Sequence, residues 1–324
     1  MSRRDIGTDD PRVRVRPGRS TKPRSKQRPD YSSAPVGRVV AIDRGRYKVF
    51  ASGVLVSCVK ARELGRGGVV MGDLVRLSGD VAGKEGTLAR IVAIEPRQHV
   101  LRRSLEDAEG KAEKIIAANT DLMVIVTATA DPEPRVGMVE RCLVAAREAR
   151  VPALLCMTKT DLADPQAFID RFRGFDLDWV AAAGELEDLR AYLENRFSVL
   201  VGHSGVGKST LINQLVPDAD RQVGHVNAQT GKGRHTSTSS VALELPGGGW
   251  VVDTPGVRSF GLGHATADHV LEVFPGLSEV AATCLPLCTH LESEPSCALS
   301  TVADQELVSR ARAILEGLSS STTG

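Results

Sequence analysis

The chain shows two kinds of apolar pattern, and the first occupies residues 37–96. There, short segments with alternating apolar and polar positions are separated by turns that contain Gly or Asp, which is typical of half-buried strands. The expected strands are residues 37–42, 46–50, 54–59, 73–77 and 87–94. Five short strands in so small a region predict a β-barrel, and we expect an OB-fold that binds RNA. A structural barrel without a ligand is the alternative.

The second pattern begins near residue 120, where continuous apolar runs alternate with segments of helical periodicity. The runs predict buried strands at residues 121–126, 152–157, 178–181 and 197–201. The helical segments between them are residues 136–150, 165–173 and 185–194. Strands that alternate with helices predict an α/β domain with a parallel sheet. We expect the polar residues 97–119 before it to form a connector that ends in a short helix.

Three further segments complete the pattern towards the C-terminus. Residues 241–245 and 250–252 predict a hairpin, turned by the Gly-rich residues 246–249. The preceding residues 223–240 are rich in Gly, Ser and Thr and are long enough to be a functional loop. Helices are expected near residues 268–274 and 305–318.

The segment Gly202–Thr210 fits the pattern G-x-x-x-x-G-K-[ST], directly after an expected strand and before a helix. Its glycines allow the backbone N–H groups to converge on phosphate oxygens at a helix N-terminus. Lys208 is expected to reach the β- and γ-phosphates and to serve as a catalytic group, and Ser209 is expected to ligate Mg²⁺. The candidate triphosphate-binding residues here are Gly202, His203, Ser204, Gly205, Val206, Gly207, Lys208, Ser209 and Thr210.

Asp253 ends a buried strand and is followed by Thr-Pro-Gly. In phosphate-loop enzymes a carboxylate at this place holds Mg²⁺ through water, and the N–H of the glycine, here Gly256, senses the γ-phosphate. Val257 follows, where Ras-like enzymes have the glutamine that orients water, so we predict slow intrinsic hydrolysis. His235 is our candidate for a catalytic helper, with an RNA-contacting or merely exposed residue as the alternative, and Thr236 is a candidate Mg²⁺ ligand.

The segment Thr158, Lys159, Thr160 and Asp161 resembles the N-K-x-D element of GTPases. The carboxylate of that element accepts two hydrogen bonds from guanine, a donor pattern that adenine lacks, and the lysine stem packs over the ring. Thr158 replaces the usual Asn and keeps a hydroxyl while losing the amide. Residues 181–184 are expected to contact the same base. A strand-end turn with an incidental Lys and Asp is the alternative.

These elements occur in an unusual order. The base-selecting segment, residues 158–161, precedes the phosphate loop, residues 202–210, and Asp253–Gly256 comes last. The order therefore predicts a circularly permuted GTPase domain. It also predicts that the segment responding to the γ-phosphate leads directly into the C-terminal region.

The C-terminal region contains the spacing Cys284-x3-Cys288-x-His290-x6-Cys297. Three thiolates and one imidazole within so short a segment are typical of a closed structural zinc site, which leaves no open position for catalysis. A group of buried free cysteines is the alternative. The other cysteines, Cys58, Cys142 and Cys156, lie within strand or helix patterns and are expected to be core residues.

Composition and charge narrow the class of protein. The 324 residues carry a formal net charge of +1, but the N-terminal segment is strongly basic and poor in large apolar residues. We expect residues 1–36 to be a disordered tail that contacts RNA or only aids solubility. Basic residues in the predicted barrel also favour RNA, namely Arg44, Arg46, Lys48, Lys60, Arg62 and Arg66. No apolar run approaches the ~20 residues that span a bilayer, and no signal peptide is evident, so we expect a cytoplasmic location without membrane contact.

Taken together, these motifs resemble the RsgA (YjeQ) family of bacterial ribosome small subunit-dependent GTPases over about residues 37–315. The resemblance rests on the phosphate loop, Gly233–Thr236, Asp253–Val257, the permuted order and the Cys/His cluster. Two gaps of that cluster depart from the family's C-x4-C-x-H-x5-C spacing. The resemblance implies late maturation of the small ribosomal subunit, with GTP hydrolysis stimulated by that subunit.

The expected organisation is multidomain: a basic tail, an OB-fold barrel, a permuted GTPase domain, a small helical zinc-binding domain and a frayed end. The corresponding ranges are residues 1–36, 37–96, 97–263, 264–318 and 319–324. We expect a monomer that binds GTP, GDP, Mg²⁺ and one structural Zn²⁺, with the small subunit and its rRNA as partners. A nucleotide-gated RNA-binding module with vestigial hydrolysis and a small-molecule kinase are the rival interpretations.

Overall fold

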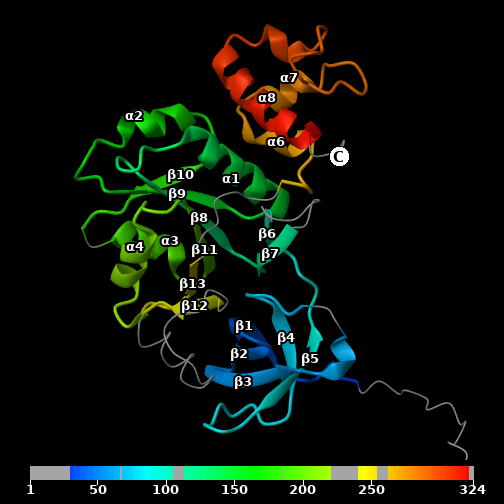
Figure 1. Cartoon of the computed structure of the whole chain (residues 1–324), viewed down its shortest axis with the longest axis vertical. Helices are drawn as coiled ribbons and strands as arrows, with labels where there is room; N and C mark the ends of the chain where they lie inside the picture. Colours follow the sequence, from blue (N-terminus) through cyan, green and yellow to red (C-terminus); the bar gives the residue numbers. More distant parts are fainter. Residues whose placement is uncertain are drawn as a thin grey trace, which may run out of the picture. The chain divides into compact units, whose positions relative to one another are not determined.

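The computed structural model describes residues 30–65, 68–104, 113–184, 186–219, 240–253 and 262–320 (Figure 1). All the described helices and strands belong to one compact unit, residues 34–324. The predicted N-terminal tail, apart from its last few residues, lies outside the described residues.

The N-terminal strands close into a five-stranded barrel. They are β1 (Val36–Asp43), β2 (Arg46–Ala51), β3 (Val54–Lys60), β4 (Leu74–Ser78) and β5 (Ala89–Ile94). The pairing runs β1-β2-β3-β5-β4 and returns to β1, with β3 and β5 parallel and the other pairs antiparallel. Alternate side chains point inward to form a separate apolar core that includes Val39, Val56 and Ile91, all fully buried. The predicted barrel is confirmed, and this order of pairing is that of an OB-fold.

The described residues at the two ends of the segment 97–119 form two paired strands, so the expected connector with a terminal helix is wrong. Strands β6 (Val100–Ser104) and β7 (Glu113–Ala118) pair antiparallel in a sheet of their own. The alanines of β7 suggest a helix locally, but pairing with β6 satisfies the backbone and places Leu101 and Ala117 in the core. The tertiary partner therefore overrides the local propensity.

A mostly parallel sheet forms the centre of the second region, in the order β10-β9-β8-β11-β13-β12. Its strands are β8 (Leu122–Ala128), β9 (Ala153–Thr158), β10 (Asp178–Ala181), β11 (Phe197–Val201), β12 (Ser240–Glu244) and β13 (Trp250–Asp253). The first five strands of this order are parallel, and β12 pairs antiparallel with β13 as the predicted hairpin. The parallel α/β prediction is confirmed.

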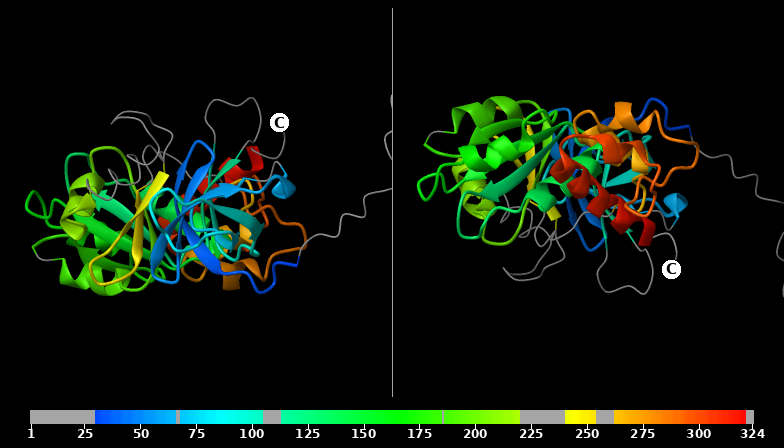
Figure 2. Two further views of the ribbon diagram at one scale, coloured as in Figure 1. Left: turned by 90° about the horizontal axis from the view of Figure 1, so that it is seen from below. Right: turned by 90° about the horizontal axis from the view of Figure 1, so that it is seen from above.

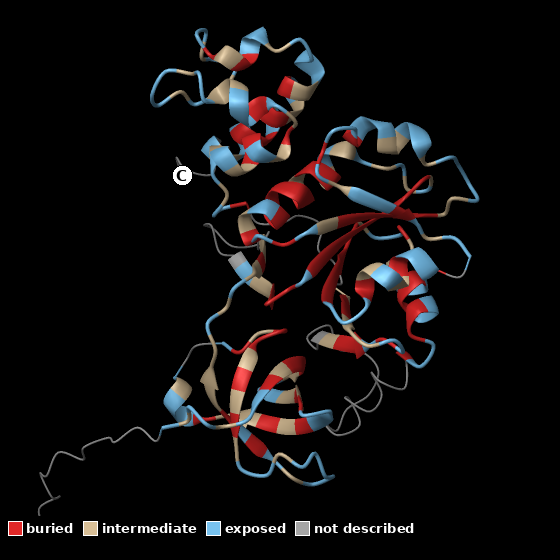
Figure 3. Ribbon diagram, turned by 180° about the vertical axis from the view of Figure 1, so that it is seen from behind, coloured by how far each residue is buried: buried red, intermediate tan, exposed pale blue. Residues whose placement is uncertain are grey.

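Helices cover both faces of this sheet, which explains its continuous apolar strands. Along β8, Met123 and Ile125 pack with helix α1 (Val136–Ala149), whereas Val124 and Val126 pack with helices on the opposite face. The opposite helices are α3 (Glu187–Leu193) and α4 (Lys208–Leu215). The central strands β8, β9 and β11 are accordingly almost wholly buried (Figure 3), whereas the edge strand β10 is mostly exposed. The predicted helical segment 165–173 is a short helix, α2 (Gln166–Ile169), followed by a 3₁₀ turn (Asp170–Phe172).

The barrel and the parallel sheet are joined by strand pairing that the sequence pattern did not predict. Barrel strand β1 pairs antiparallel with β12, matching Ala41 with Val241 and Ile42 with Ser240. Figure 2 shows the blue strand of the barrel beside the yellow strand of the hairpin. The rings of Phe50 and Trp250 also meet, with centroids 5.2 Å apart. One continuous hydrogen-bonded sheet therefore runs through both regions.

The C-terminal region consists of short helices that share a core with α1. They are α6 (Ala267–Val273), α7 (Leu277–Ala281), a 3₁₀ turn (Ala298–Thr301) and α8 (Gln305–Ser320). Helix α7 was not predicted. Phe274 and Ile314 belong to the same apolar cluster as Val139 and Leu143 of α1. Two ion pairs join α1 to these helices, Arg147–Glu272 and Arg310–Glu140, and a third, Arg171–Glu306, joins the 3₁₀ turn after α2 to α8.

The Arg310–Glu140 pair is the most buried of the three. The Glu140 side chain is 3% exposed, and the Arg310 guanidinium donates to its Oε1 at 2.5 Å. Burial raises the pKa of Glu140, and Arg310 opposes that rise. The pair holds α8 against α1. Removal of either partner leaves the other charge buried without a counter-ion, which strongly lowers the free energy of unfolding.

We predict that Arg310→Met lowers the free energy of unfolding by about 3–5 kcal/mol near neutral pH, because it leaves a buried carboxylate without its cation. A carboxyl group with a raised folded-state pKa favours folding when protonated, so this deficit should shrink as pH falls through that pKa. Thermal or urea unfolding of the variant and the parent protein over that pH range tests this. The double variant Glu140→Gln/Arg310→Met should recover most of the loss. The interpretation would be contradicted if the loss of unfolding free energy did not change with pH and if Glu140→Gln did not restore it.

Candidate functional site: a nucleotide site and a metal centre

Five parallel strands end on one edge of the sheet, and the candidate nucleotide-binding residues follow them. The base-selecting segment follows β9, the phosphate loop follows β11, and Asp253 ends β13. Residues 182–184 follow β10, and the Ala182 N–H donates to the Met157 carbonyl at 2.7 Å. Parallel pairing thus brings segments distant in sequence to the edge where ligands of such sheets bind.

The phosphate loop has a backbone that requires glycine. Gly202 lies so close to β8 that an added Cβ would be 2.2 Å from the Val126 carbonyl oxygen. Gly205 and Gly207 have φ values of 84° and 92°, in the left-handed region. Helix α4 then begins at Lys208, so its unpaired N–H groups and partial positive charge lie at the end of the loop.

Lys208 lies against the loop itself. Its Nζ donates to the carbonyl oxygens of Gly202, at 2.5 Å, and His203, at 3.1 Å. Burial lowers the pKa of Lys208, while the negative charge of Asp253 opposes that change. Lys208 begins α4 just after β11, and Asp253 ends the neighbouring strand β13, so both lie at the same edge of the sheet. Ser209 and Thr210, by contrast, are exposed on the first turn of α4.

The base-selecting segment is hydrogen-bonded directly to the phosphate loop. The buried hydroxyl of Thr158 lies 2.5 Å from the Val206 carbonyl oxygen and 3.3 Å from that of Thr127. A hydroxyl donates one hydrogen, and the shorter distance assigns it to Val206. An Asn side chain at this position would offer amide hydrogens for the same purpose, so Thr158 retains the donor through a shorter side chain. Val206 itself is 2% exposed, so the hydrogen bond between Thr158 and Val206 is buried.

The loop that follows β8 supports the base-selecting segment, and sequence reasoning missed it. The Thr129 hydroxyl donates to the Lys159 carbonyl at 2.5 Å, and the Thr129 N–H donates to the Thr158 carbonyl at 3.0 Å. The Lys159 ammonium donates to the Asp131 carbonyl. The sequence does contain one indication of this loop. It follows the buried strand β8, which is parallel to β9, so it lies at the same edge of the sheet as the base-selecting segment.

The remaining nucleotide candidates differ in how they are placed. Asp161 is exposed and Thr160 is half-buried, both within the turn that ends β9. Gly256, His235 and Thr236 lie outside the described residues, as does Val257. The structure thus brings together the phosphate loop, the base-selecting segment and Asp253, while the catalytic role of His235 and the magnesium role of Thr236 stay predictions.

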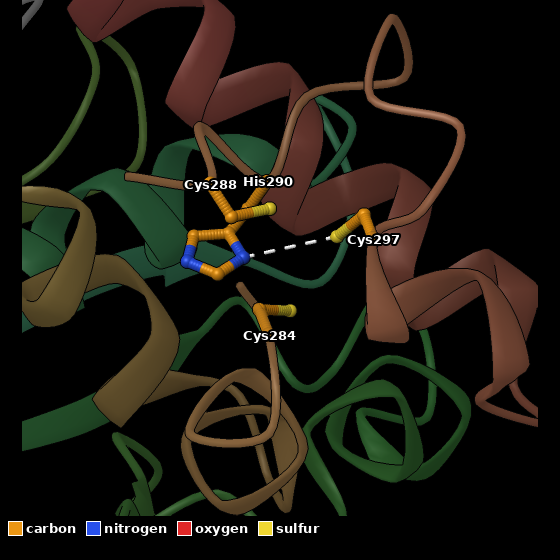
Figure 4. Close-up of side chains that lie close together, drawn as sticks. All are labelled: Cys284, Cys288, His290 and Cys297. Carbon is orange, nitrogen blue, oxygen red and sulfur yellow. Dashed lines mark hydrogen bonds between the residues drawn. The ribbon is translucent and has the colours of Figure 1, made fainter. Parts of the chain in front are cut away.

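The four Cys/His candidates converge on one point. The ligand atoms of Cys284, Cys288, His290 and Cys297 all lie within 4.8 Å of one another, with side chains that point inward (Figure 4). His290 Nδ1 lies 3.7 Å from Cys297 Sγ. Three thiol sulfurs and one imidazole nitrogen at this spacing fit a tetrahedral metal with bonds of about 2.0–2.3 Å. The alternative of scattered free cysteines is therefore disfavoured.

Neighbouring groups hold this cluster in shape. The Ala298 N–H donates to Cys284 Sγ at 3.3 Å. Arg312 of α8 donates to the His290 carbonyl at 3.2 Å and to the Ser300 hydroxyl at 3.0 Å. Such supporting bonds orient metal ligands.

The other cysteines are core residues, as the sequence pattern predicts. Cys58, Cys142 and Cys156 are buried, and burial raises the pKa of each thiol to about 12. At neutral pH they remain protonated and behave as small apolar side chains.

A phosphate loop and a base-selecting segment on one edge of a parallel sheet, in this chain order, define a circularly permuted phosphate-loop GTPase. Comparison with known proteins agrees, because a family model described as RsgA GTPase matches residues 94–263. The chain belongs to the RsgA GTPase family.

Relatives and solved structures give the extent of the similarity. The "Small ribosomal subunit biogenesis GTPase RsgA" of Pseudomonas fluorescens (strain SBW25) is 39% identical over 242 residues, covering 71% of this chain and 69% of that protein. The protein of the same name from Chlorobaculum parvum is 36% identical, covering 71% and 78%. The structure of YloQ, described as a circularly permuted GTPase, covers 88% of this chain and 95% of its own, with a TM-score of 0.64 and 21% identity. YjeQ from Thermotoga maritima has a TM-score of 0.63 and 21% identity, with 88% and 98% covered.

We predict that Thr158→Val lowers affinity for guanine nucleotides about tenfold, which corresponds to ~1.4 kcal/mol. The substitution keeps the shape of the side chain but removes the donor that joins the base-selecting segment to the Val206 carbonyl. Titration of a fluorescent GDP analogue measures the effect. Thr158→Ser is the matched control, because it keeps the hydroxyl, and it should bind nearly as the parent protein does. Equal affinity of the Val variant and the parent would show that this contact does not position the site.

Proposed function

We propose that this protein is a GTP hydrolase that binds the small ribosomal subunit and couples hydrolysis to late maturation of that subunit. The observation that carries the nucleotide part is the contact between the base-selecting segment and the phosphate loop, through Thr158 and Val206. The proposed biological role is supported by the curated relatives, whose name refers to small ribosomal subunit biogenesis.

Each group at the sheet edge has a distinct proposed role. Asp161 accepts the two guanine hydrogen bonds, and the stem of Lys159 covers the base. The N–H groups of the phosphate loop and Lys208 bind the β- and γ-phosphates, where Lys208 also stabilises charge that develops during hydrolysis. Ser209 ligates Mg²⁺ directly and Asp253 does so through water, with Mg²⁺ supplying charge neutralisation between the phosphates.

The residues beyond the described part complete the proposed machinery. Thr236 adds a ligand to Mg²⁺, the N–H of Gly256 senses the γ-phosphate, and His235 positions the attacking water. Val257 cannot orient water by hydrogen bonding, so hydrolysis is slow until the small subunit brings the catalytic groups into place.

The proposed RNA contact lies on the barrel. Its cationic side chains include the exposed Arg44, Arg46 and Arg62, and β-barrels of this topology bind oligonucleotides. The partner there is the rRNA of the small subunit. A cytoplasmic monomer fits this role, and among the described residues no helix combines the length and apolar character that crossing a bilayer requires.

A second candidate function is favoured by one residue. Because Val257 replaces the water-orienting glutamine, the protein could act as a nucleotide-gated RNA-binding module whose hydrolysis is vestigial. In that case the small subunit binds the GTP form but does not accelerate turnover.

We predict that GTP turnover is slow for the protein alone and rises at least tenfold with purified small subunits, but not with large subunits. Phosphate release under multiple turnover measures this. His235→Ala should lower the stimulated rate at least tenfold without changing GTP affinity, because only water positioning is lost.

Two outcomes would contradict these assignments separately. Tight binding to small subunits without faster turnover would favour the vestigial-hydrolysis alternative. An His235→Ala protein that hydrolyses GTP at the parent rate, with and without subunits, would remove the catalytic assignment of His235.

We further propose that the Cys/His cluster binds one structural Zn²⁺. The soft thiolates and the closed set of four ligands suit zinc better than Mg²⁺ or Ca²⁺. The metal would fix the segment between α7 and the 3₁₀ turn that precedes α8, and it takes no part in hydrolysis.

Elemental analysis should find about one zinc per chain, following the closed four-ligand pattern. Cys288→Ser should reduce the zinc content and lower the thermal unfolding midpoint, because metal binding stabilises only the folded form. Cys142→Ala is the control, since it alters a buried cysteine outside the cluster and should leave the zinc content unchanged. Full metal occupancy of the Cys288→Ser protein would contradict the ligand set.

A further inference from the structure

The segment between the first two metal-ligand candidates presents apolar side chains to solvent. We call Leu285, Pro286 and Leu287 the knuckle tip. Leu287 is 98% exposed and Leu285 is 69% exposed. The other exposed large apolar residues of the described chain are between 39% and 56% exposed. Two leucines so largely exposed within three residues are unusual on a surface that meets only water.

The knuckle tip is held in a fixed shape. The Cys288 N–H donates to the Leu285 carbonyl at 3.2 Å, which closes a turn, and the Cys284 N–H donates to the Ala281 carbonyl of α7 at 3.0 Å. Leu287 has a φ of 69°, a left-handed conformation that is strained for a leucine. The tip is flanked by Cys284 and Cys288, whose side chains point into the Cys/His cluster (Figure 4). A preorganised apolar projection loses little freedom when it binds.

The chain on either side of the tip is acidic. Residues 259–309 contain no Lys or Arg. The same range contains seven acidic residues: Asp268, Glu272, Glu279, Glu292, Glu294, Asp304 and Glu306. Glu279 and Glu292 are exposed, and no ion pair to either occurs within the described residues.

The cations that follow this range bond within the protein, and Arg258, which precedes it, lies outside the described residues. Arg310 pairs with the buried Glu140, and Arg312 donates to the His290 carbonyl and the Ser300 hydroxyl. The segment that carries the tip therefore supplies no lysine or arginine to neutralise phosphates, which nucleic-acid contacts require. An acidic rim around an apolar projection instead complements a basic protein surface.

We propose that the knuckle tip docks into an apolar pocket on a basic protein, with Glu279 and Glu292 facing cationic side chains at the rim of that pocket. The proposal rests on the proposed function, because the partner is one of the proteins of the small ribosomal subunit. The C-terminal region thus recognises protein, while the barrel and its cations recognise RNA.

The direct test replaces Leu287 by the photoreactive residue p-benzoylphenylalanine. The full-length protein is irradiated on purified small subunits with a non-hydrolysable GTP analogue. We expect a crosslinked product that protease destroys and ribonuclease leaves intact, and mass spectrometry should identify a protein rich in Lys and Arg. Leu88 of the barrel, 48% exposed, is the matched position and should not crosslink to the same protein.

Affinity measurements provide the second arm. Leu285→Ser/Leu287→Ser should weaken binding to small subunits about tenfold, whereas Leu88→Ser should not produce the same loss. Glu279→Lys/Glu292→Lys should also weaken binding. The affinity of this variant should fall less steeply with added salt, because the attraction that salt screens has been removed. Because these side chains are exposed, unchanged thermal unfolding and metal content confirm that the variants fold.

The outcomes separate the docking proposal from the proposed function. An unsubstituted protein that does not bind small subunits overturns the proposed function, and the docking proposal with it. Binding of the unsubstituted protein with a crosslink to RNA, or without any crosslink from position 287, overturns the docking proposal alone. Full affinity of the double Ser variant would do the same.

Discussion

The hydrogen bond between the Thr158 hydroxyl and the Val206 carbonyl is the contact on which the proposed site depends. It joins two loops that are more than forty residues apart in the chain. The register of the parallel strands makes it possible, because β8 pairs with both β9 and β11 and so aligns their ends. A phosphate loop binds triphosphates in general, and only a base-selecting segment fixed against it converts that site into one for a particular purine.

The C-terminal region is coupled to the GTPase sheet by packing as well as by the chain. Its helices share an apolar core with α1, two ion pairs cross the same contact, and a third joins α8 to the 3₁₀ turn after α2. Only thirteen residues separate Asp253 from the start of α6. We propose that a change at the γ-phosphate reaches the C-terminal region through this short stretch of chain. In the account proposed here, that route connects nucleotide state to a surface that recognises a protein partner.

Local signals were sufficient for some elements and not for others. The phosphate loop was predictable because strand, glycines and helix start are contiguous, and the Cys/His cluster because its ligands lie within one short segment. The β6–β7 hairpin was missed because its alanines favour a helix until a partner strand is present. The pairing of β1 with β12 joins residues about two hundred positions apart, and no local pattern encodes it.

Within the site, too, some contacts depend on residues that are distant in the sequence. The supporting role of Thr129 depends on the position of β9 beside β8, which a single sequence does not specify. Thr158 lacks the side-chain amide of the usual Asn. The structure nevertheless keeps a hydrogen-bond donor at this position, because the buried Thr158 hydroxyl lies within reach of the Val206 carbonyl.

The most direct test of the central claim is the nucleotide preference of the Asp161→Asn variant. The account predicts that the parent protein binds GTP far more tightly than ATP or xanthosine triphosphate. In the variant, the carboxylate that accepts from guanine becomes an amide that donates to the C2 carbonyl of xanthine, so the preference should move from GTP to xanthosine triphosphate by at least 100-fold, or about 2.7 kcal/mol. An unchanged preference for GTP would show that Asp161 and Lys208 do not bind opposite ends of one guanine nucleotide.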